Sequence, residues 1–235
     1  MSFGNGPRIV TDGLVLSLDA GDRNSYPGSG TTWSDLSGNG NHATATTPQY
    51  SGSNGGSFNF PNNTTSVFNT PSYTLVPNGG VTMEAFIYPT YDTFYLNPGN
   101  GSGITGRRNA YIYGMDIGPN VTPGGNPFTD VELSGVSSGT SAALPYAIPN
   151  TWYHILWTYS TTSVKSYVNG ANQTSTSGTY SPPTDTTPFQ IGKRWGGFGY
   201  PLYGNIAIVR WYNRSLSATE ILQNYNTQKS RFDLK

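Results

Sequence analysis

The acidic residues carry the first candidate chemistry of this chain. Hydrolysis of a glycosidic bond needs two carboxyl groups that face the bond, about 5 to 10 Å apart. The three glutamates, Glu84, Glu132 and Glu220, are isolated from one another and from paired aspartates. Glu220 closes a capping-box pattern, and Glu84 lies in a predicted strand, where a hydrogen-bonded or edge carboxylate is the simpler interpretation. The carboxylates therefore predict no catalytic pair.

The two histidines do not complete a catalytic triad. Such a triad needs a histidine with a nucleophile and a carboxylate, and no serine lies in a Gly-x-Ser-x-Gly elbow. His154 lies in an aromatic strand, which favours a core histidine with satisfied hydrogen bonds, and His42 ends a turn, which favours a structural role. The chain has no cysteine, so cysteine nucleophiles and thiolate zinc sites are excluded. We predict no catalytic residues and no enzymatic activity.

One short loop has the composition of a calcium site. Residues 35–41 read Asp-Leu-Ser-Gly-Asn-Gly-Asn and offer a carboxylate, side-chain amides and glycine carbonyls. These are the oxygen ligands that calcium accepts. Asp35, Asn39 and Asn41 are the candidate ligands in this loop. The alternative is that the same side chains form Asx turns with the backbone of the loop.

Two aromatic clusters lie in predicted loops, where large apolar side chains would be exposed to water unless they bind or pack against something. The first contains Trp195, Phe198, Tyr200 and Tyr203 in a glycine-rich segment, and the second contains Tyr91, Phe94 and Tyr95. Stacking of the rings on sugar faces is one such contact. Loop tips that fold back over the domain, or contacts with a neighbouring subunit, are the others. We take these residues as candidates for binding a glycan or a protein partner.

Charge and hydropathy exclude several kinds of partner. Lys plus Arg is 12 and Asp plus Glu is 12, so the formal net charge is zero and gives no electrostatic footprint for nucleic acid or an anionic membrane. No run approaches the roughly 20 apolar residues of a membrane span, and the first residues lack a signal-peptide stretch. We expect a soluble product that carries no Sec signal and does not insert into membranes.

Short blocks of alternating hydrophobicity predict the elements that hold these residues. Expected strands cover residues 14–18, 57–60, 81–88, 110–115, 152–159, 164–168, 189–192 and 204–212. The strand over 152–159 carries large side chains on both faces, which predicts a central position beside 164–168. A capping box at Ser217 predicts a helix from there to about residue 224. The polar segments 97–108, 119–126 and 175–188 are expected to be turns.

Many strands without alternating helices predict an all-β fold, a two-layer antiparallel sandwich with one short C-terminal helix. No internal repeat or linker divides the 235 residues. We predict an N-terminal arm over residues 1–12, a single domain over 13–226 and a C-terminal tail over 227–235. The tail is expected to be mobile or to dock on a partner.

Seven short motifs follow one another along the chain. They are residues 13–20 (GLVLSLDA), 33–42 (WSDLSGNGNH), 84–89 (EAFIYP), 152–154 (WYH), 167–170 (YVNG), 191–193 (IGK) and 208–217 (IVRWYNRSLS). In this order they resemble the concanavalin A-like, laminin-G-like jelly rolls over nearly the whole chain. The resemblance implies a jelly-roll sandwich and a structural calcium near residues 35–41, with Asp19 and Asp35 as the best ligands. Against calcium, the family's Ile-Asp-Glu-Val reads Ile-Ala-Ile-Val at 206–209.

The opening over residues 19–30 and the ending over 224–232 are similar to stand-alone structural proteins of tailed bacteriophages. This resemblance implies a non-enzymatic protein on the virion surface, a capsid decoration or fibre-associated subunit that contacts other virion proteins and its own copies as a homo-oligomer. Lysis would release such a protein without an export signal. The alternative is a calcium-supported, lectin-like carbohydrate-binding module that adheres to surface glycans through residues 195–203.

Overall fold

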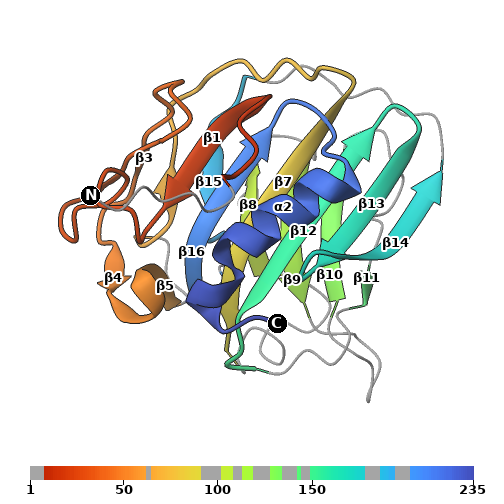
Figure 1. Ribbon diagram of the computed structural model, residues 1–235. Coiled ribbons are helices and arrows are strands. Elements are labelled where there is room, and N and C mark those ends of the chain that lie inside the picture. The colour runs from red at the N-terminus through yellow and green to blue at the C-terminus, as the bar shows by residue number, and fades with distance from the viewer. Residues whose placement is uncertain are drawn as a thin grey trace, which may run out of the picture.

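The computed structural model describes residues 8–61, 65–90, 102–107, 113–118, 128–133, 142–143, 149–177, 186–193 and 202–235. Its strands form two antiparallel sheets packed face to face, and one α-helix crosses the outer face of the front sheet (Figure 1). This arrangement confirms the predicted all-β jelly-roll sandwich with a short C-terminal helix.

Sheet A is the front sheet of Figure 1 and has the strand order β14-β13-β12-β7-β16-β5-β4, with β1 also paired to β16. Its strands are β1 (Leu14–Asp19), β4 (Gln49–Ser51), β5 (Ser57–Pro61), β7 (Gly80–Pro89), β12 (Tyr153–Ser160), β13 (Ser163–Val168), β14 (Ala171–Ser177) and β16 (Tyr203–Tyr212). Sheet B has the order β11-β10-β9-β8-β15-β6-β3-β2. Its strands are β2 (Thr32–Trp33), β3 (Ala43–Thr44), β6 (Phe68–Asn69), β8 (Ser102–Arg107), β9 (Tyr113–Gly118), β10 (Phe128–Leu133), β11 (Ala142–Ala143) and β15 (Phe189–Ile191).

Strand β12 lies in the interior of sheet A, between β7 and β13, as its two apolar faces predict. Every residue of β12 except Ser160 is buried. The turn after β13 contains Asn169 and Gly170 with φ of 50° and 76°, the left-handed pair that a tight hairpin requires. That turn leads into β14, so sheet A continues outward by one more hairpin.

The core lies between the sheets because alternation sends one side of each strand inward. In β7 the inward residues are Val81, Met83, Ala85 and Ile87, which join a cluster with Trp157 and other residues of both sheets. Trp211 is fully buried there, and its indole N–H donates to the Thr105 hydroxyl of sheet B at 3.1 Å. This burial supplies most of the stabilisation that holds the two sheets together.

The outer face of sheet A is covered by α2 (Ala218–Gln228) and a 3₁₀ turn, η2 (Lys229–Phe232). A further 3₁₀ turn, η1 (Ser53–Gly55), precedes β5. The Ser217 hydroxyl accepts from the Glu220 amide while the Glu220 carboxylate accepts from the Ser217 amide, which confirms the predicted capping box. The described helices are too short and too polar to cross a membrane.

Residues 227–235, expected to form a tail, pack on the same chain. The Phe232 ring is buried and lies 4.9 Å from that of Phe86 and 4.6 Å from that of Trp152. The described part of the expected N-terminal arm, residues 8–12, is also held, because the Val10 amide donates to the Asn224 side chain at 2.8 Å. Both ends of the described chain therefore meet on the outer face of sheet A.

Two segments that composition assigned to turns contain strands. Residues 102–107 form β8, with Ile104 and Thr105 buried, and β14 extends through residues 175–177. The expectation was wrong because Gly and Ser are poor strand formers alone, whereas here the neighbours β9 and β15 supply hydrogen bonds to β8 on both sides. Tertiary pairing overrides local propensity at these positions.

Candidate functional site

A cluster of charged and polar side chains lies beneath α2, and it is the first place where catalysis could be sought. Glu84 and His154 are fully buried, and the histidine Nε2 lies 3.0 Å from Glu84 Oε1. Arg210 Nη1 donates to the same oxygen at 3.2 Å, and Asn224 Nδ2 donates to Oε2 at 2.8 Å. The Tyr212 hydroxyl accepts from Asn224 and donates to the Val10 carbonyl.

This cluster is sealed from solvent, and both oxygens of Glu84 accept hydrogen bonds, whereas His154 Nδ1 and Arg210 Nε are buried without a partner among the described residues. Burial alone raises the pKa of Glu84, but Arg210 beside it and the hydrogen bonds from His154 and Asn224 outweigh burial and bring the pKa below its ordinary value. The carboxylate is thus a charged structural anchor between the sheet and the helix. The prediction of a core histidine at His154 is confirmed, but only one ring nitrogen is satisfied: Nε2 bonds to Glu84, whereas Nδ1 has no partner among the described residues. The buried cluster gives a substrate no access.

The loop over residues 35–41 is bound to β1 through its own polar groups. Asp35 Oδ1 accepts from the backbone amides of Ser17 and Ser37, each at 2.9 Å, and Oδ2 accepts from the Ser37 hydroxyl at 2.7 Å and the Asn41 amide at 3.0 Å. Asn39 Nδ2 donates to the Leu14 carbonyl at 3.1 Å. The loop has the Asx-turn geometry that the alternative interpretation described.

The remaining contacts of the loop are of the same kind. Asn41 Nδ2 donates to the Val15 carbonyl at 2.9 Å, and His42 Nδ1 accepts from the Asp35 amide at 3.0 Å. The structural role expected for His42 is therefore confirmed. Asn39 and Asn41 both turn amide N–H groups, which cannot ligate a cation, toward β1.

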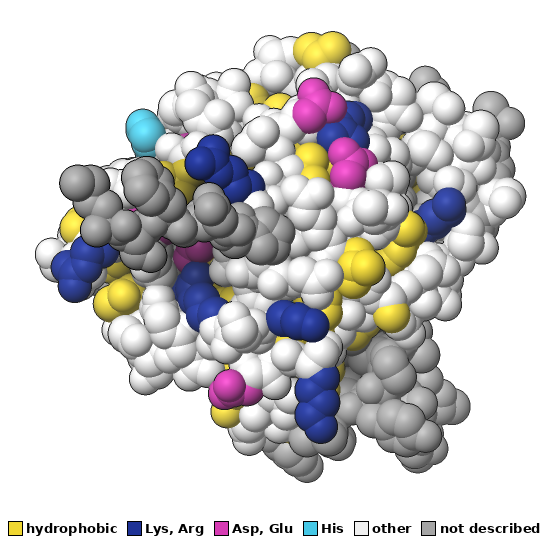
Figure 2. Space-filling model, in the orientation of Figure 1, with side chains coloured by type: hydrophobic (Ala, Val, Ile, Leu, Met, Phe, Trp, Pro, Cys, Tyr) yellow, Lys and Arg dark blue, Asp and Glu magenta, His cyan; other side chains and the backbone are white. Residues whose placement is uncertain are grey.

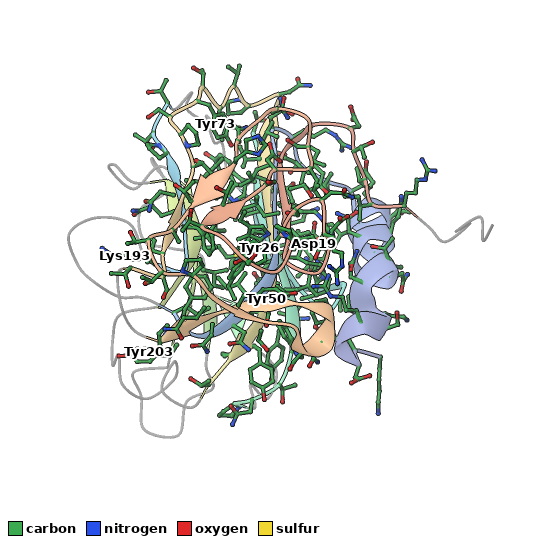
Figure 3. All side chains as sticks on the ribbon, turned by 90° about the vertical axis from the view of Figure 1, so that its left-hand side faces the viewer. Asp19, Tyr26, Tyr50, Tyr73, Lys193 and Tyr203 are labelled. Atoms are coloured by element: carbon green, nitrogen blue, oxygen red, sulfur yellow. The ribbon has the colours of Figure 1, made fainter. Side chains whose placement is uncertain are left out.

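Asp19, the fourth predicted calcium ligand, has a different partner. Its Oδ1 accepts from Arg231 Nη1 at 2.6 Å and from the Gly21 amide at 2.9 Å, and it lies on the side of the molecule that faces η2 (Figure 3). The described residues contain no group of three or more acidic, His or Cys side chains that could hold a metal. The four predicted ligands do not fit a shared calcium ion, because both Asp35 oxygens and Asp19 Oδ1 already accept from N–H or O–H donors, and Asn39 and Asn41 direct N–H groups toward β1. Calcium stays an untested prediction.

Of the six predicted glycan- or partner-binding residues, Tyr203 is the one whose position is described. Trp195, Phe198, Tyr200, Tyr91 and Tyr95 lie outside the described residues. The Tyr203 carbonyl accepts from both the amide and the hydroxyl of Thr90, each at 3.0 Å. Thr90 is next to Tyr91 in the chain. Thr90, the residue before one aromatic segment, is therefore bonded to Tyr203, the last residue of the other.

The base of the 194–201 segment is fixed in the core. The Leu202 amide donates to the Gly192 carbonyl at 3.0 Å, and the Gly192 amide donates to the Ile104 carbonyl at 2.9 Å. Gly192 has φ of 87°, and a Cβ there would lie 2.0 Å from the Phe60 ring, so glycine is required for this closure. Figure 3 shows Lys193 and Tyr203 on the side of the molecule opposite α2. We call the region around Thr90, Lys193 and Tyr203 the Tyr203 end.

Two asparagines that the sequence did not single out lie next to Tyr203. Asn205 is two residues further along β16, and Asn59 faces it from β5. Asn59 Nδ2 donates to Asn205 Oδ1 at 2.8 Å, which leaves the Asn59 amide oxygen and the Asn205 amide NH2 group without a partner in the described part of the chain. No local signal could reveal this pair, because its members are 146 residues apart.

Comparison with known proteins agrees with the geometry. The family model described as "Concanavalin A-like lectin/glucanases superfamily" matches residues 61–222. A search of curated proteins found no match.

Several solved structures are similar in fold. Domain 4 of AbnA, an extracellular arabinanase of Geobacillus stearothermophilus solved with arabinotriose, has a TM-score of 0.63 and 19% identity, covering 90% of this chain and 98% of that one. The binding domain of Paraclostridial Mosquitocidal Protein 1 has a TM-score of 0.70 and 16% identity, covering 92% and 52%. The ligand-binding domain of botulinum neurotoxin serotype D, solved with N-acetylneuraminic acid, has a TM-score of 0.68 and 15% identity, covering 93% and 52%. The chain thus spans about half of each toxin domain, and these likenesses show the fold alone.

Proposed function

The chain belongs to the concanavalin A-like lectin/glucanases superfamily, and from this premise we propose that it is a lectin-like carbohydrate-binding module. The observation that carries the proposal is the pair of hydrogen bonds from Thr90 to Tyr203, which joins the residue before one aromatic segment to the last residue of the other. Aromatic rings together with side-chain amides are the composition that sugar recognition uses. Two of the similar structures were solved with a sugar bound, which supports the same class of ligand.

The proposal is binding without turnover. Glycosidic hydrolysis needs a pair of accessible carboxyl groups. Glu84 is sealed beneath α2, and Glu220 is engaged by Arg214 and the helix cap. We propose that the Tyr203 end holds a neutral glycan through ring stacking by Tyr203 and the two aromatic segments, with Asn59 and Asn205 as polar contacts for sugar hydroxyls.

A glycan array followed by titration tests this function. We expect binding in the micromolar to millimolar range that Tyr203→Ala weakens at least about tenfold, since one stacked aromatic contact contributes roughly 1 to 3 kcal/mol. Tyr203→Phe is the matched control, because it keeps the ring and should keep most of the affinity. Absence of any bound glycan at millimolar concentration would overturn the proposal.

The resemblance to phage structural proteins adds a location, which is a proposal of its own. A jelly roll on the virion surface could contact capsid or fibre proteins, or sister copies, through other faces while the Tyr203 end holds a host glycan. The two roles are compatible, since they use different surfaces. Light scattering of the purified chain at two concentrations tests the assembly part, and a stable trimer or larger ring would favour it.

A further inference from the structure

A cavity lies at the opposite end of β16 from Tyr203. It has a volume of about 460 Å³ and lies on the outer face of sheet A, between β12, β13 and the start of α2. This volume is within the range of small-molecule sites, about 300–1,000 Å³. In Figure 2 acidic and basic side chains lie together over the start of α2, with mostly uncoloured polar surface toward β13.

Most of the charge at this cavity is neutralised within the protein. Arg214 Nη2 lies 2.6 Å from Glu220 Oε1, and Arg214 Nε lies 2.7 Å from Asp12 Oδ2. The hydrogen bond from Arg214, together with those from Ser217, lowers the pKa of Glu220 to about 2. Arg214 and Glu220 are thus an ion pair within the lining, whereas Asp12 pairs with Arg214 from outside it. Lys165, Arg214 and Glu220 together leave the lining with one net positive charge near neutral pH.

Lys165 is the exception. It lines the cavity and is half-buried, and its ammonium has no ion pair or hydrogen bond with any part of the chain that the structure describes. Its cross-strand neighbours are Thr158 in β12 and Ser175 in β14, neither of which carries a charge. A lysine stem held at a cavity wall without a counter-charge attracts an anionic group from outside the protein.

The same cavity also contains hydroxyl groups without partners. Thr158 and Ser215 line it, and neither side chain has a hydrogen-bond partner within the described residues. Thr158 is 3% exposed and lines the cavity, so a ligand held there would meet its hydroxyl. The Tyr167 ring, packed against Leu216 and Leu156, forms part of the wall.

We propose that this cavity is a second binding site, which takes an acidic sugar residue whose carboxylate pairs with Lys165 and whose hydroxyls bond to Thr158 and Ser215. Lys165 lies beside neutral hydroxyls, and the other two charges of the lining, Arg214 and Glu220, are paired with each other. One unpaired cation suits a polyhydroxylated carboxylate better than a free phosphate, which would favour several unpaired cations. The site is independent of the proposed neutral-glycan surface at the Tyr203 end. The chain would then bind two parts of one glycan, or two separate glycans, at opposite ends of β16.

Titration calorimetry with three probes tests this proposal: methyl glucuronide, the matched neutral methyl glucoside, and inorganic phosphate. We expect glucuronide to bind at least about tenfold more tightly than glucoside, since a charge-assisted hydrogen bond contributes roughly 1.5 to 3 kcal/mol. Lys165→Met should remove that preference, and Thr158→Val should weaken glucuronide binding. Lys235→Met is the control for loss of an exposed positive charge, and it should bind as the wild type does.

Three results would overturn the acidic-sugar site: no glucuronide binding, phosphate binding as tight as glucuronide, or a preference that survives Lys165→Met. Tyr203→Ala separates this proposal from the one above. That variant should retain glucuronide binding in the cavity, whereas Lys165→Met should retain neutral-glycan binding at the Tyr203 end. Melting curves of Lys165→Met and Lys235→Met confirm that each variant is folded before its titration is read.

Discussion

Glu84 holds the buried polar cluster together, because Arg210, His154 and Asn224 all converge on its two oxygens. Replacing Glu84 by Gln keeps the shape of the side chain but leaves the Arg210 charge buried without a counter-charge. Removing one partner of a buried ion pair costs about 3 to 5 kcal/mol. We therefore expect Glu84→Gln to lower the free energy of unfolding, measured by urea denaturation, by about 3 to 5 kcal/mol.

The control for this experiment is Asp12→Asn, which breaks an ion pair at the surface. The Asp12 side chain is 85% exposed, and such pairs contribute little to stability. We therefore expect this variant to unfold at nearly the wild-type urea concentration. Equal losses in the two variants would show that the cluster under α2 adds no more than a surface contact.

Asp35 carries the second prediction at this scale. Its carboxylate oxygens accept four hydrogen bonds from Ser17, Ser37 and Asn41, so the loop is closed without a cation. We expect a chelator to shift the melting temperature by less than about 1 °C, whereas Asp35→Ala should lower it clearly. A large loss of stability on chelation would restore the calcium prediction, with the loop rearranged around the ion.

At the scale of elements, the capping box of α2 gives a prediction about pH. The Arg214 and Ser217 hydrogen bonds lower the pKa of Glu220 from 4.5 to about 2. A carboxylate with a lowered pKa in the folded state stabilises that state fully above its ordinary pKa, and this contribution is lost as pH falls from about 4.5 to about 2. Glu220→Gln should therefore cost about 1 kcal/mol at pH 7, and progressively less across that window.

The comparison of Glu220→Gln with the wild type isolates this effect. Glu84 also has a lowered pKa, but it is present in both chains and cancels in the difference. Urea unfolding at several pH values gives the free energies directly. A difference that stays constant between pH 7 and pH 2.5 would contradict the role of the Glu220 charge.

The attachment of η2 to sheet A is tested at Phe232. The ring packs on Phe86 and Trp152 and is 2% exposed, whereas Leu222 of α2 is 46% exposed. Deleting a buried Phe side chain typically costs about 3 to 5 kcal/mol, and a fully packed site is the upper limit. We expect Phe232→Ala to cost roughly 3 kcal/mol and Leu222→Ala to cost much less. Similar values would place Phe232 outside the cooperative core.

Elements whose signals are local could be predicted, and those set by distant partners could not. The capping box at Ser217 spans four residues, and the Asn169–Gly170 turn needs only its own two, so both were readable from the sequence. In β8 the strand conformation depends on hydrogen bonds with β9 and β15, which no local pattern contains. Glycine-rich composition hid that strand.

At the scale of the whole molecule, alternation and motif order predicted the sandwich and the interior position of β12. The candidate site was predicted only as two aromatic segments, because the closeness of Thr90 to Tyr203 spans 113 residues of chain. The Lys165 cavity was not foreseen for the same reason. It combines β12 and β13 with Ser215 and the start of α2, which the fold alone brings together.

Both sheets share one core, and this predicts how the whole molecule unfolds. Trp33 of sheet B and Trp157 and Trp211 of sheet A are all fully buried in the same cluster. Helix α2 and the segment around Val10 are attached to this core, because Asn224 of α2 bonds both to Val10 and to Glu84 of sheet A. We expect tryptophan fluorescence and far-ultraviolet circular dichroism to report one transition with the same urea midpoint. In Phe232→Ala both midpoints should fall together. If the fluorescence midpoint held while part of the dichroism signal was lost at lower urea, then α2 and η2 would unfold separately from the sandwich they cover.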